Sequence, residues 1–207
     1  MKIGFIGCGN MARAMINGML KKGFPKEEII ASAKSEKTLS YISDEIGITA
    51  ESENANVAKN ADIVILAVKP VYMEDVINEI KGEISLRKIV VTLAPGKTIE
   101  WLEKKFGKRI KLVRTMPNTP AMVSEGMTAL CPNDKITEKD LKVVMKMFDS
   151  FGKAEVVSEN IIDAVVGVSG SSPAFVFMFI EAMADAAVAE GMPRAQAYKF
   201  AAQTVMG

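Results

Sequence analysis

The chain has 207 residues with 26 basic and 25 acidic side chains, and 49% of its residues are hydrophobic. This balance is typical of a globular α/β protein, and no charged run is long enough to indicate binding to nucleic acid or to an anionic membrane. The sequence has no histidine and two cysteines. It therefore predicts neither a metal site nor a disulfide framework, and any chemistry must proceed without an imidazole.

The first half alternates short apolar runs with segments of helical period. The run at 63–68 is apolar on both faces, as expected of a central strand in a parallel sheet. Met11, Met15 and Met19 recur at helical spacing. This alternation predicts βαβ units and a mostly parallel sheet. The predicted strands lie at 2–7, 29–31, 63–68, 89–93, 110–114 and 128–130, and the predicted helices at 10–22, 35–46, 71–80 and 99–106.

From residue 137 the pattern changes. Thr137-Glu138-Lys139-Asp140 resembles a capping-box start and predicts a helix to about Phe151, followed by a short strand at 154–157. After 167–173 the chain is rich in Ala and Met and predicts two helices, broken at Gly191-Met192-Pro193 because glycine ends helices and proline begins them. We expect one domain over 1–158 and a helical one over 159–207.

The predicted C-terminal helices carry more apolar residues than two helices can enclose. We expect them to pack on another subunit or on further chain, so a homo-oligomer is favoured, and packing against the first domain is the alternative. The most apolar run, 174–180, is stopped by Glu181 and is too short to span a bilayer. The N-terminus lacks the apolar core of a signal peptide, so we expect a cytoplasmic protein.

The stretch Gly7-Cys8-Gly9-Asn10-Met11-Ala12 follows the first predicted strand and begins the first helix. It matches the dinucleotide-binding pattern G-x-G-x-x-A. Gly7 permits a tight turn, and Gly9 lets a pyrophosphate rest on N–H groups at the positive end of the helix dipole. Ala12 keeps the helix close to the strand. A plain strand-to-helix turn is the alternative, and Cys8 is assigned no nucleophilic role.

The end of the second predicted strand bears on cofactor choice. NAD-selective proteins usually carry Asp or Glu there, whereas this chain has Ala31-Ser32-Ala33-Lys34-Ser35. Lys34 and the two hydroxyls are suited to a 2′-phosphate, which favours NADP(H), with NAD(H) as the alternative. A solvated surface lysine is the competing interpretation of Lys34.

Two further segments follow strands, at the sheet edge where doubly wound folds bind ligands. Ala67-Val68-Lys69-Pro70 ends the central strand, where Lys69 either meets a cofactor ribose or phosphate or has a structural role. Met116-Pro117-Asn118-Thr119-Pro120 is stiffened by two prolines. Asn118 and Thr119 either present donors toward the nicotinamide or substrate, or belong to a stiff turn.

Together these stretches resemble the pyrroline-5-carboxylate reductase family. The matching segments are GFIGCGNMARAM, AVKP, MPNTPAMVSEGMTAL and DAVVGVSGSSPAFVFMFIEAMADAAVAEGMPR with AAQTVMG, and they follow the family's order along the whole chain. The resemblance implies an α/β protein: a Rossmann-type, mostly parallel sheet with helices on both faces, then an all-helical, here partial, dimerisation segment that often builds higher rings.

The resemblance also implies the reaction, the NAD(P)H-dependent reduction of 1-pyrroline-5-carboxylate to L-proline that ends proline biosynthesis. The protonated cyclic imine accepts hydride at C5, so the protein must hold the reactants together, exclude water and clamp the carboxylate. Substrate is implied near Asn118 and Thr119 and near the 169–172 turn, with Ser169 and Ser171 as candidates, and no proton donor is identified. The implied cofactor contacts are Ile6, Gly7, Cys8, Gly9, Asn10, Met11, Ser32, Lys34, Ser35, Asn54, Ala67, Val68, Lys69, Pro70, Leu93, Ala94 and Pro95.

The chain departs from the family pattern at two points. Ser172 stands where the family has a glycine in SGSGPA, which predicts a stiffer or shifted turn. The family also continues through further helices, including a Ser/Thr/Gly-rich loop that binds the substrate carboxylate and is often completed by a dimer partner.

Two other functions fit parts of the pattern. A β-hydroxyacid dehydrogenase shares the plan of a Rossmann domain followed by helices. It needs a catalytic lysine on an early helix of the second domain, and residues 172–190 contain none. A noncatalytic NADPH-binding module that acts through dimer contacts is the other alternative.

Overall fold

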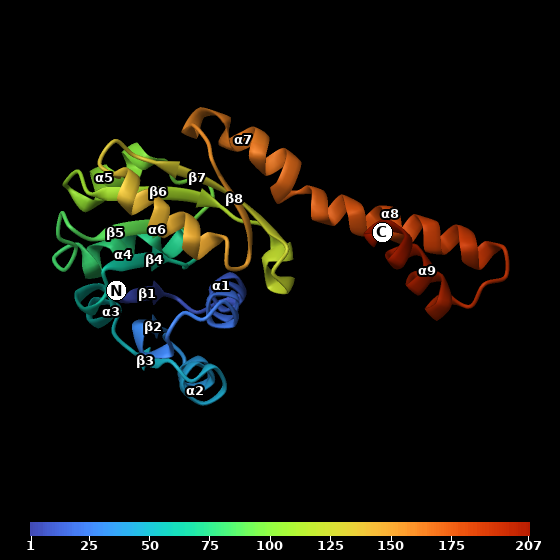
Figure 1. Cartoon of the computed structure of the whole chain (residues 1–207), viewed down its shortest axis with the longest axis horizontal. Helices are drawn as coiled ribbons and strands as arrows, with labels where there is room; N and C mark the ends of the chain where they lie inside the picture. Colours follow the sequence, from blue (N-terminus) through green and yellow to red (C-terminus); the bar gives the residue numbers. More distant parts are fainter. The chain divides into compact units, whose positions relative to one another are not determined.

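The computed structural model describes residues 1–207, which divide into two compact units, 1–165 and 166–207 (Figure 1). The first unit contains one eight-stranded sheet. Its strands are β1 (Ile3–Ile6), β2 (Ile29–Ser32), β3 (Thr49–Glu51), β4 (Ile63–Leu66), β5 (Ile89–Thr92), β6 (Lys111–Met116), β7 (Gly126–Pro132) and β8 (Gly152–Val156).

The strand order is β3-β2-β1-β4-β5-β6-β7-β8. Strands β1 to β6 are parallel to one another, β7 is antiparallel to β6, and β8 is parallel to β7. The first six strands therefore have the order of a doubly wound Rossmann sheet, which confirms the predicted fold class.

Alternate residues of the strands enter two different cores because successive side chains of a strand point to opposite faces. In β4, Ile63 and Ile65 join one core, and Val64 and Leu66 join the other. The first core includes side chains of helices α1 (Asn10–Lys21) and α6 (Glu138–Phe148), and the second includes those of α3 (Asn54–Asn60), α4 (Met73–Ile80) and α5 (Ile99–Phe106). Helices cover both faces of the sheet, as predicted (Figure 1).

Several helices begin and end at capping residues that the sequence contains. The side chain of Thr98 accepts a hydrogen bond from a first-turn N–H of α5, whose bounds match the predicted ones. Thr137 and Asp140 form the predicted capping box of α6, although this helix ends at Phe148 rather than Phe151. The predicted helix at 35–46 is present as α2 (Glu36–Ser40) followed by a π-helix, Tyr41–Ile46.

Two elements of the first unit were not predicted, strand β3 and helix α3. Strand β3 has three residues at the sheet edge, and α3 has the polar sequence NANVAKN. This helix packs very closely on β1, because a Cβ at Gly4 would lie 2.6 Å from Val57 Cγ1. The glycine inside β1 therefore makes room for α3, which in turn places Asn54 near the end of β2.

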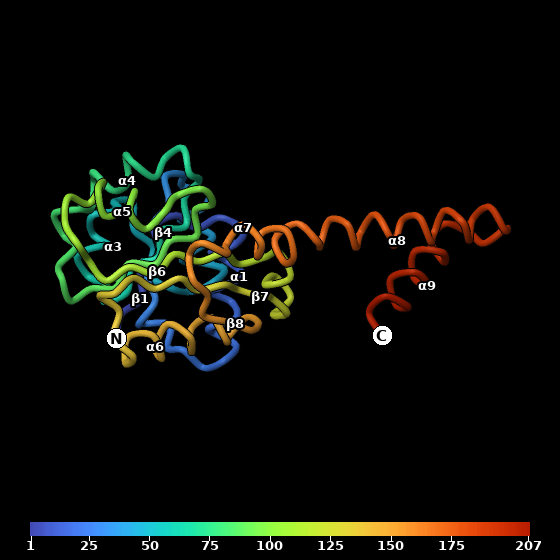
Figure 2. Tube along the Cα trace, turned by 90° about the horizontal axis from the view of Figure 1, so that it is seen from above, coloured from blue at the N-terminus to red at the C-terminus, as the bar shows by residue number.

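The second unit contains a short π-helix and then α8 (Ser172–Ala189) and α9 (Arg194–Met206), which form a helical hairpin (Figure 2). Gly191 has φ +95° and Pro193 precedes α9, so the break lies where it was predicted. Three small residues, Ala184, Ala197 and Ala201, are buried at the contact between the helices, and partly buried side chains such as Ile180 and Met183 pack against them.

The turn expected at 169–172 is mostly helical. Residues Val166–Gly170 form a π-helix, and Ser172 begins α8. The Ser172 hydroxyl donates to the Gly167 carbonyl oxygen at 3.3 Å. Serine therefore stands at a helix start, where it donates to the preceding π-helix.

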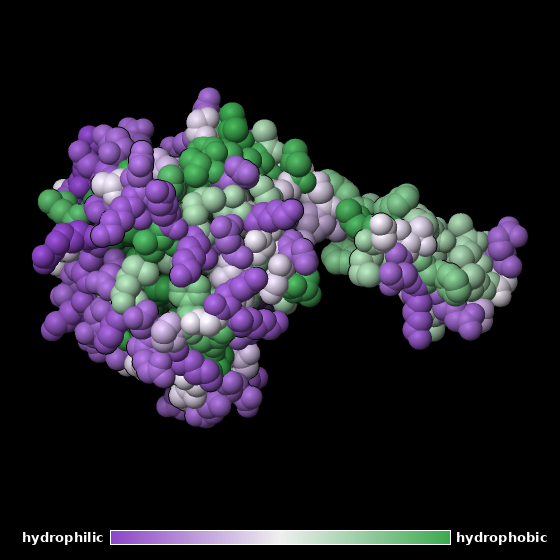
Figure 3. All heavy atoms as spheres, viewed as in Figure 1, coloured by the Kyte–Doolittle hydropathy of each residue, from purple (hydrophilic) through white to green (hydrophobic).

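Most large apolar side chains of the second unit are exposed (Figure 3). A helix that is apolar around its circumference needs cover beyond a single neighbouring helix. The exposed large side chains are Val168, Phe175, Val176, Phe177, Met178, Phe179, Tyr198, Phe200 and Met206.

The continuous helical stretch Glu159–Ala189 has 31 residues and is long and apolar enough to cross a membrane by length and composition. The expectation that this region is too short for a span was therefore wrong. It counted only residues 174–180, whereas the helix continues past the charged residues that flank them. Core helices of water-soluble proteins pass the same test of length and composition.

Candidate functional site

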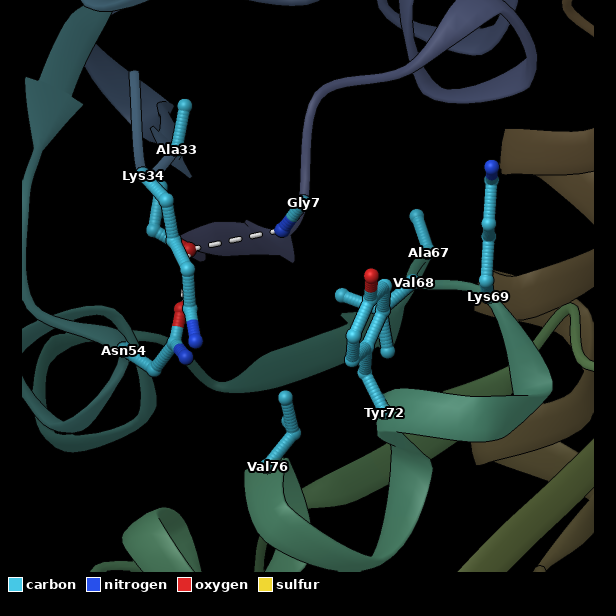
Figure 4. A pocket seen from close by; sticks show the side chains of 10 residues that line it. Gly7, Ala33, Lys34, Asn54, Ala67, Val68, Lys69, Tyr72 and Val76 are labelled. Atoms are coloured by element: carbon cyan, nitrogen blue, oxygen red, sulfur yellow. Dashed lines mark hydrogen bonds between the residues drawn. The ribbon is translucent and has the colours of Figure 1, made fainter. Parts of the chain in front are cut away.

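A cavity of about 380 Å³ lies at the C-terminal ends of β1, β2 and β4 (Figure 4). Strand β1 lies between β2 and β4. Strands β2 and β3 extend the sheet on one side of β1, and β4, β5 and β6 extend it on the other, so the strand order reverses at β1. Open α/β sheets bind ligands at such a switch point. The cavity is lined by Gly7, Ser32, Ala33, Lys34, Asn54, Ala67, Val68, Lys69, Tyr72 and Val76.

The two glycines of the first loop have different reasons to be glycine. Gly7 has φ +90°, and a Cβ there would lie 2.9 Å from Val68 Cγ1. Gly9 has φ −80°, and a Cβ there would meet nothing within 4 Å. The packing of the chain itself therefore requires glycine at position 7 but not at position 9. The open space over Gly9 is what a ligand needs in order to approach the backbone.

The N-terminus of α1 lacks the protein groups that usually neutralise a helix start. No side chain caps it, and its first turn contains no acidic residue, in contrast to α5 and α6. The first-turn N–H groups and the helix dipole therefore favour an anion at this end. Together with the space over Gly9, this arrangement fits the diphosphate of a dinucleotide.

Arg13, on α1, stabilises the glycine loop through a hydrogen bond to its backbone. Its Nε donates to the Cys8 carbonyl oxygen at 3.1 Å, and its guanidinium carbon lies 4.1 Å from the centre of the Tyr41 ring. Burial raises the pKa of the Cys8 thiol, and the nearby Arg13 charge only partly opposes this. The thiol is therefore kept in its protonated form, in agreement with the prediction that Cys8 is not a nucleophile.

A chain of hydrogen bonds forms the polar side of the cavity. The Gly7 N–H donates to Ser32 Oγ at 3.4 Å, the dashed contact in Figure 4. Ser32 Oγ donates to Asn54 Oδ1 at 2.7 Å, and Asn54 Nδ2 donates to Glu79 Oε2 at 2.5 Å. The Lys34 side chain lies on the same side of the cavity as Asn54 (Figure 4). This side offers a cation and an amide to an acceptor group.

The opposite side of the cavity is apolar, formed by Val68, Tyr72 and Val76 (Figure 4). Tyr72 is 54% exposed, so much of its side chain is open to a ligand. A flat aromatic surface opposite a polar one is suited to a nucleoside. Sequence reasoning placed Ala33 in the cofactor loop at 32–35 but missed Tyr72 and Val76. The apolar period of α4 marks Val76 as facing inward, whereas no local pattern distinguishes Tyr72.

The structure brings together a large part of the predicted dinucleotide site. Cys8 and Gly9 form the loop, and Asn10 and Met11 begin α1. Ser35 caps α2 by accepting from the Thr38 N–H at 3.3 Å. The predicted residues that line the cavity are Gly7, Ser32, Lys34, Asn54, Ala67, Val68 and Lys69, and those outside its lining are Ile6, Cys8, Gly9, Asn10, Met11, Ser35, Pro70, Leu93, Ala94 and Pro95. The individual cofactor contacts of all these residues stay predictions.

The predicted substrate residues lie in both units. Asn118 Oδ1 accepts from the Met127 N–H at 2.8 Å, which ties the loop between β6 and β7 to the start of β7. Thr119 begins a short 3-10 helix, Thr119–Val123, and is exposed. Ser169 lies in the π-helix before α8, and Ser171 is exposed just before α8. The substrate contacts of these four residues stay predictions.

Comparison with known proteins shows similarity over the whole chain. The family model described as NADP oxidoreductase coenzyme F420-dependent matches residues 2–96, and the model described as pyrroline-5-carboxylate reductase dimerisation matches residues 159–207. The pyrroline-5-carboxylate reductase of Escherichia coli is 50% identical over 100% of this chain and 77% of the relative.

Solved structures agree with this similarity. A pyrroline-5-carboxylate reductase from Coxiella burnetii superimposes with a TM-score of 0.94 at 34% identity, over 100% of this chain and 77% of the other. The Plasmodium falciparum pyrroline carboxylate reductase with NADP bound gives a TM-score of 0.90 at 33% identity, over 100% and 76% of the two chains.

Proposed function

The chain belongs to the pyrroline-5-carboxylate reductase family, and from this premise we propose which of its residues serve the reaction. It is an oxidoreductase of proline biosynthesis that reduces 1-pyrroline-5-carboxylate to L-proline, and its cofactor is NADP(H), with NAD(H) as the alternative. We assign dinucleotide binding to residues 1–158 and dimerisation and substrate binding to residues 159–207.

The observation that carries the dinucleotide assignment is the uncapped start of α1 below the open space at Gly9. We assign the diphosphate to this loop and to the first-turn N–H groups of the helix. Lys34 and Asn54 then recognise the 2′-phosphate, and Val68, Tyr72 and Val76 cover the adenosine. The charge of Lys34 contributes to NADPH preference because a phosphate binds more strongly to an ammonium group than a hydroxyl does.

The bound dinucleotide supplies the hydride for the imine carbon. The reaction also consumes one proton, which the imine nitrogen carries when it is protonated, so the protein needs no histidine. The role that we assign to the chain is to hold the two reactants in contact and to exclude water. Asn118 and Thr119, at the end of β6, are the candidates for contact with the substrate, together with Ser169 and Ser171.

The match of residues 159–207 to a dimerisation model indicates a homo-oligomer. We infer that a second copy of the chain covers the exposed apolar side chains of α8 and α9, as a homodimer or as part of a larger ring. This assignment uses the apolar helices for protein contact and gives neither a membrane nor a nucleic acid a role. Both cysteines are free and buried, as is ordinary in a reducing compartment, and a cytoplasmic location stays a prediction.

A steady-state assay tests this function by following the oxidation of NADPH and of NADH in the presence of 1-pyrroline-5-carboxylate. We expect turnover with NADPH, and we expect Lys34→Glu to raise the KM for NADPH by about tenfold with less than about a twofold change for NADH. Lys37→Glu, which changes an exposed lysine outside the cavity, is the matched control. No turnover on the imine would contradict the function, and equal losses with both dinucleotides would contradict the role of Lys34.

A further inference from the structure

We infer that Glu79 is a positioning residue that sets the orientation of the Asn54 amide and thereby favours NADPH over NADH. This inference rests on the proposed function. Glu79 lies on α4 outside the lining of the cavity, and its Oε2 accepts from Asn54 Nδ2 at 2.5 Å. Asn54 begins α3 and does line the cavity. Glu79 therefore reaches the dinucleotide site only through Asn54.

The carboxylate determines which way the amide faces. An ionised carboxylate only accepts hydrogen bonds, so the Asn54 –NH₂ group must be the end that points to Glu79. The other end, Oδ1, then accepts from the Ser32 hydroxyl at 2.7 Å. Ser32 by itself does not choose between the two ends, because a hydroxyl both donates and accepts. Among these hydrogen-bonded side chains, Glu79 is therefore the one that fixes the orientation of the Asn54 amide.

The orientation of the amide affects the two dinucleotides differently. The phosphate that distinguishes NADPH offers only acceptor oxygens near neutral pH and gains from every N–H that faces it. The 2′-hydroxyl of NADH donates or accepts and so adjusts to either end of the amide. Asn54 stands on the same side of the cavity as Lys34 (Figure 4), so a reversed amide would place a carbonyl oxygen on the side that receives the phosphate.

Glu79→Gln separates this role from a simple charge effect. If Glu79 acted only through its negative charge, its neutralisation would strengthen NADPH binding. Glutamine donates as well as accepts, so it no longer dictates the amide orientation. We therefore expect weaker NADPH binding in spite of the lost negative charge.

The experiment measures the Kd of NADPH and of NADH by isothermal titration calorimetry on the full chain. We expect Glu79→Gln to raise the Kd of NADPH about fivefold and that of NADH by less than twofold, with kcat at saturating NADPH unchanged. Glu83→Gln removes the same charge from an exposed position outside the cavity lining and should change neither Kd. In an Asn54→Ala background Glu79→Gln should have no further effect on the NADPH to NADH ratio.

Tighter or unchanged NADPH binding in Glu79→Gln would overturn the inference. So would equal weakening of both dinucleotides, because that is the result of a general structural role. A persistent effect in the Asn54→Ala background would also overturn it, since the effect would not pass through the amide. Failure of the unsubstituted chain to bind either dinucleotide would contradict the proposed function instead.

Discussion

The two units of the molecule differ in how far they bury their large apolar side chains. In residues 1–165 the sheet and its helices enclose large side chains such as Phe5, Phe148 and Phe151, which are fully buried. In residues 166–207 the buried residues are three alanines, whereas Phe177 is 70% exposed and Phe200 is 65% exposed. Two helices in contact therefore do not bury their own large apolar side chains, because a stable unit needs layers that cover both sides of its apolar elements.

The helix ends differ in the same sense. The side chains of Ser35, Thr98 and Thr137 cap three helices of the first unit, although α1, α3 and α4 have no side-chain cap, whereas neither α8 nor α9 has one. The first unit is stabilised by local signals together with its own core. The second unit depends on packing that its own residues do not supply, so the two units should respond to substitution in different ways.

Substitution of the same residue type in each unit gives the largest expected contrast in stability. Phe148→Ala removes a fully buried ring that lies 5.3 Å from the Phe151 ring, and should lower the free energy of unfolding by about 3–5 kcal/mol. Phe200→Ala should act through association instead, so its effect should grow with protein concentration. Urea unfolding at two protein concentrations measures both. The contrast would be contradicted if the destabilisation by Phe148→Ala, relative to the unsubstituted chain, changed with protein concentration, or if that by Phe200→Ala did not.

The next test removes two aromatic side chains from one face of α8. Phe175 and Phe179 are one helical turn apart and 61% and 59% exposed. The double substitution Phe175→Ser and Phe179→Ser should weaken self-association by about a hundredfold or more, because buried aromatic anchors dominate interface energies. Light scattering coupled to gel filtration measures the mass, with Glu181→Gln as the control on the same helix. An unchanged oligomer in the double variant would show that this face is not the interface.

A third test asks whether the dinucleotide loop can lose its function without loss of its fold. Gly9→Ala should raise the Kd of NADPH about tenfold or more, because the new methyl group occupies the space over the loop. The free energy of unfolding should fall by less than about 1 kcal/mol, since that space is empty of protein atoms.

Gly7→Ala is the matched control. A side chain at Gly7 would be strained at φ +90° and crowded by Val68, so this variant should lose about 1–3 kcal/mol of stability as well as binding. Full NADPH binding in Gly9→Ala would contradict the assignment of the diphosphate to this loop.

The smallest expected effect concerns the cap of α6. Burial raises the pKa of Asp140, but hydrogen bonds from Lys111 and Thr137 outweigh burial and lower it overall. A carboxyl whose pKa is lower in the folded than in the unfolded state stabilises the fold above the unfolded pKa, and this contribution disappears as pH falls through the folded pKa. When the pH falls from about 6 to below the ordinary pKa of an aspartate, the free energy of unfolding of the unsubstituted protein should fall by about 1 kcal/mol more than that of Asp140→Asn. Parallel stability–pH curves would contradict this.

Much of the fold could be predicted because the first unit follows local rules closely. The bounds of α5 and the capping box of α6 were confirmed, and so was the break at Gly191. Strand β3 and helix α3 escaped prediction because their stability comes from packing at the sheet edge and against Gly4 rather than from an apolar period. The continuous helix over 159–189 was also missed, since the expected turn contains glycine and serine residues that a π-helix accommodates.

The residues of the site also divide into those that the sequence pattern places and those that only the tertiary structure places. The glycine loop and Lys34 are close in sequence to the ends of predicted strands, so they could be placed from the pattern alone. Tyr72 and Glu79 come from the segment after β4, and nothing in the sequence indicates how that segment meets α3. Their positions follow from the crossover that brings β4 beside β1, which only the tertiary structure shows.

The place of β1 in the sheet has a consequence for biosynthesis. Ile3 pairs with Ile29 on one side and Ile63 on the other, so β1 leaves the ribosome before both of the strands that flank it. Parallel pairing over such separations is slow, because long loops must close first. Until Leu66 has emerged, one edge of this apolar strand stays unpaired on the nascent chain, which exposes it to aggregation or to a chaperone during translation.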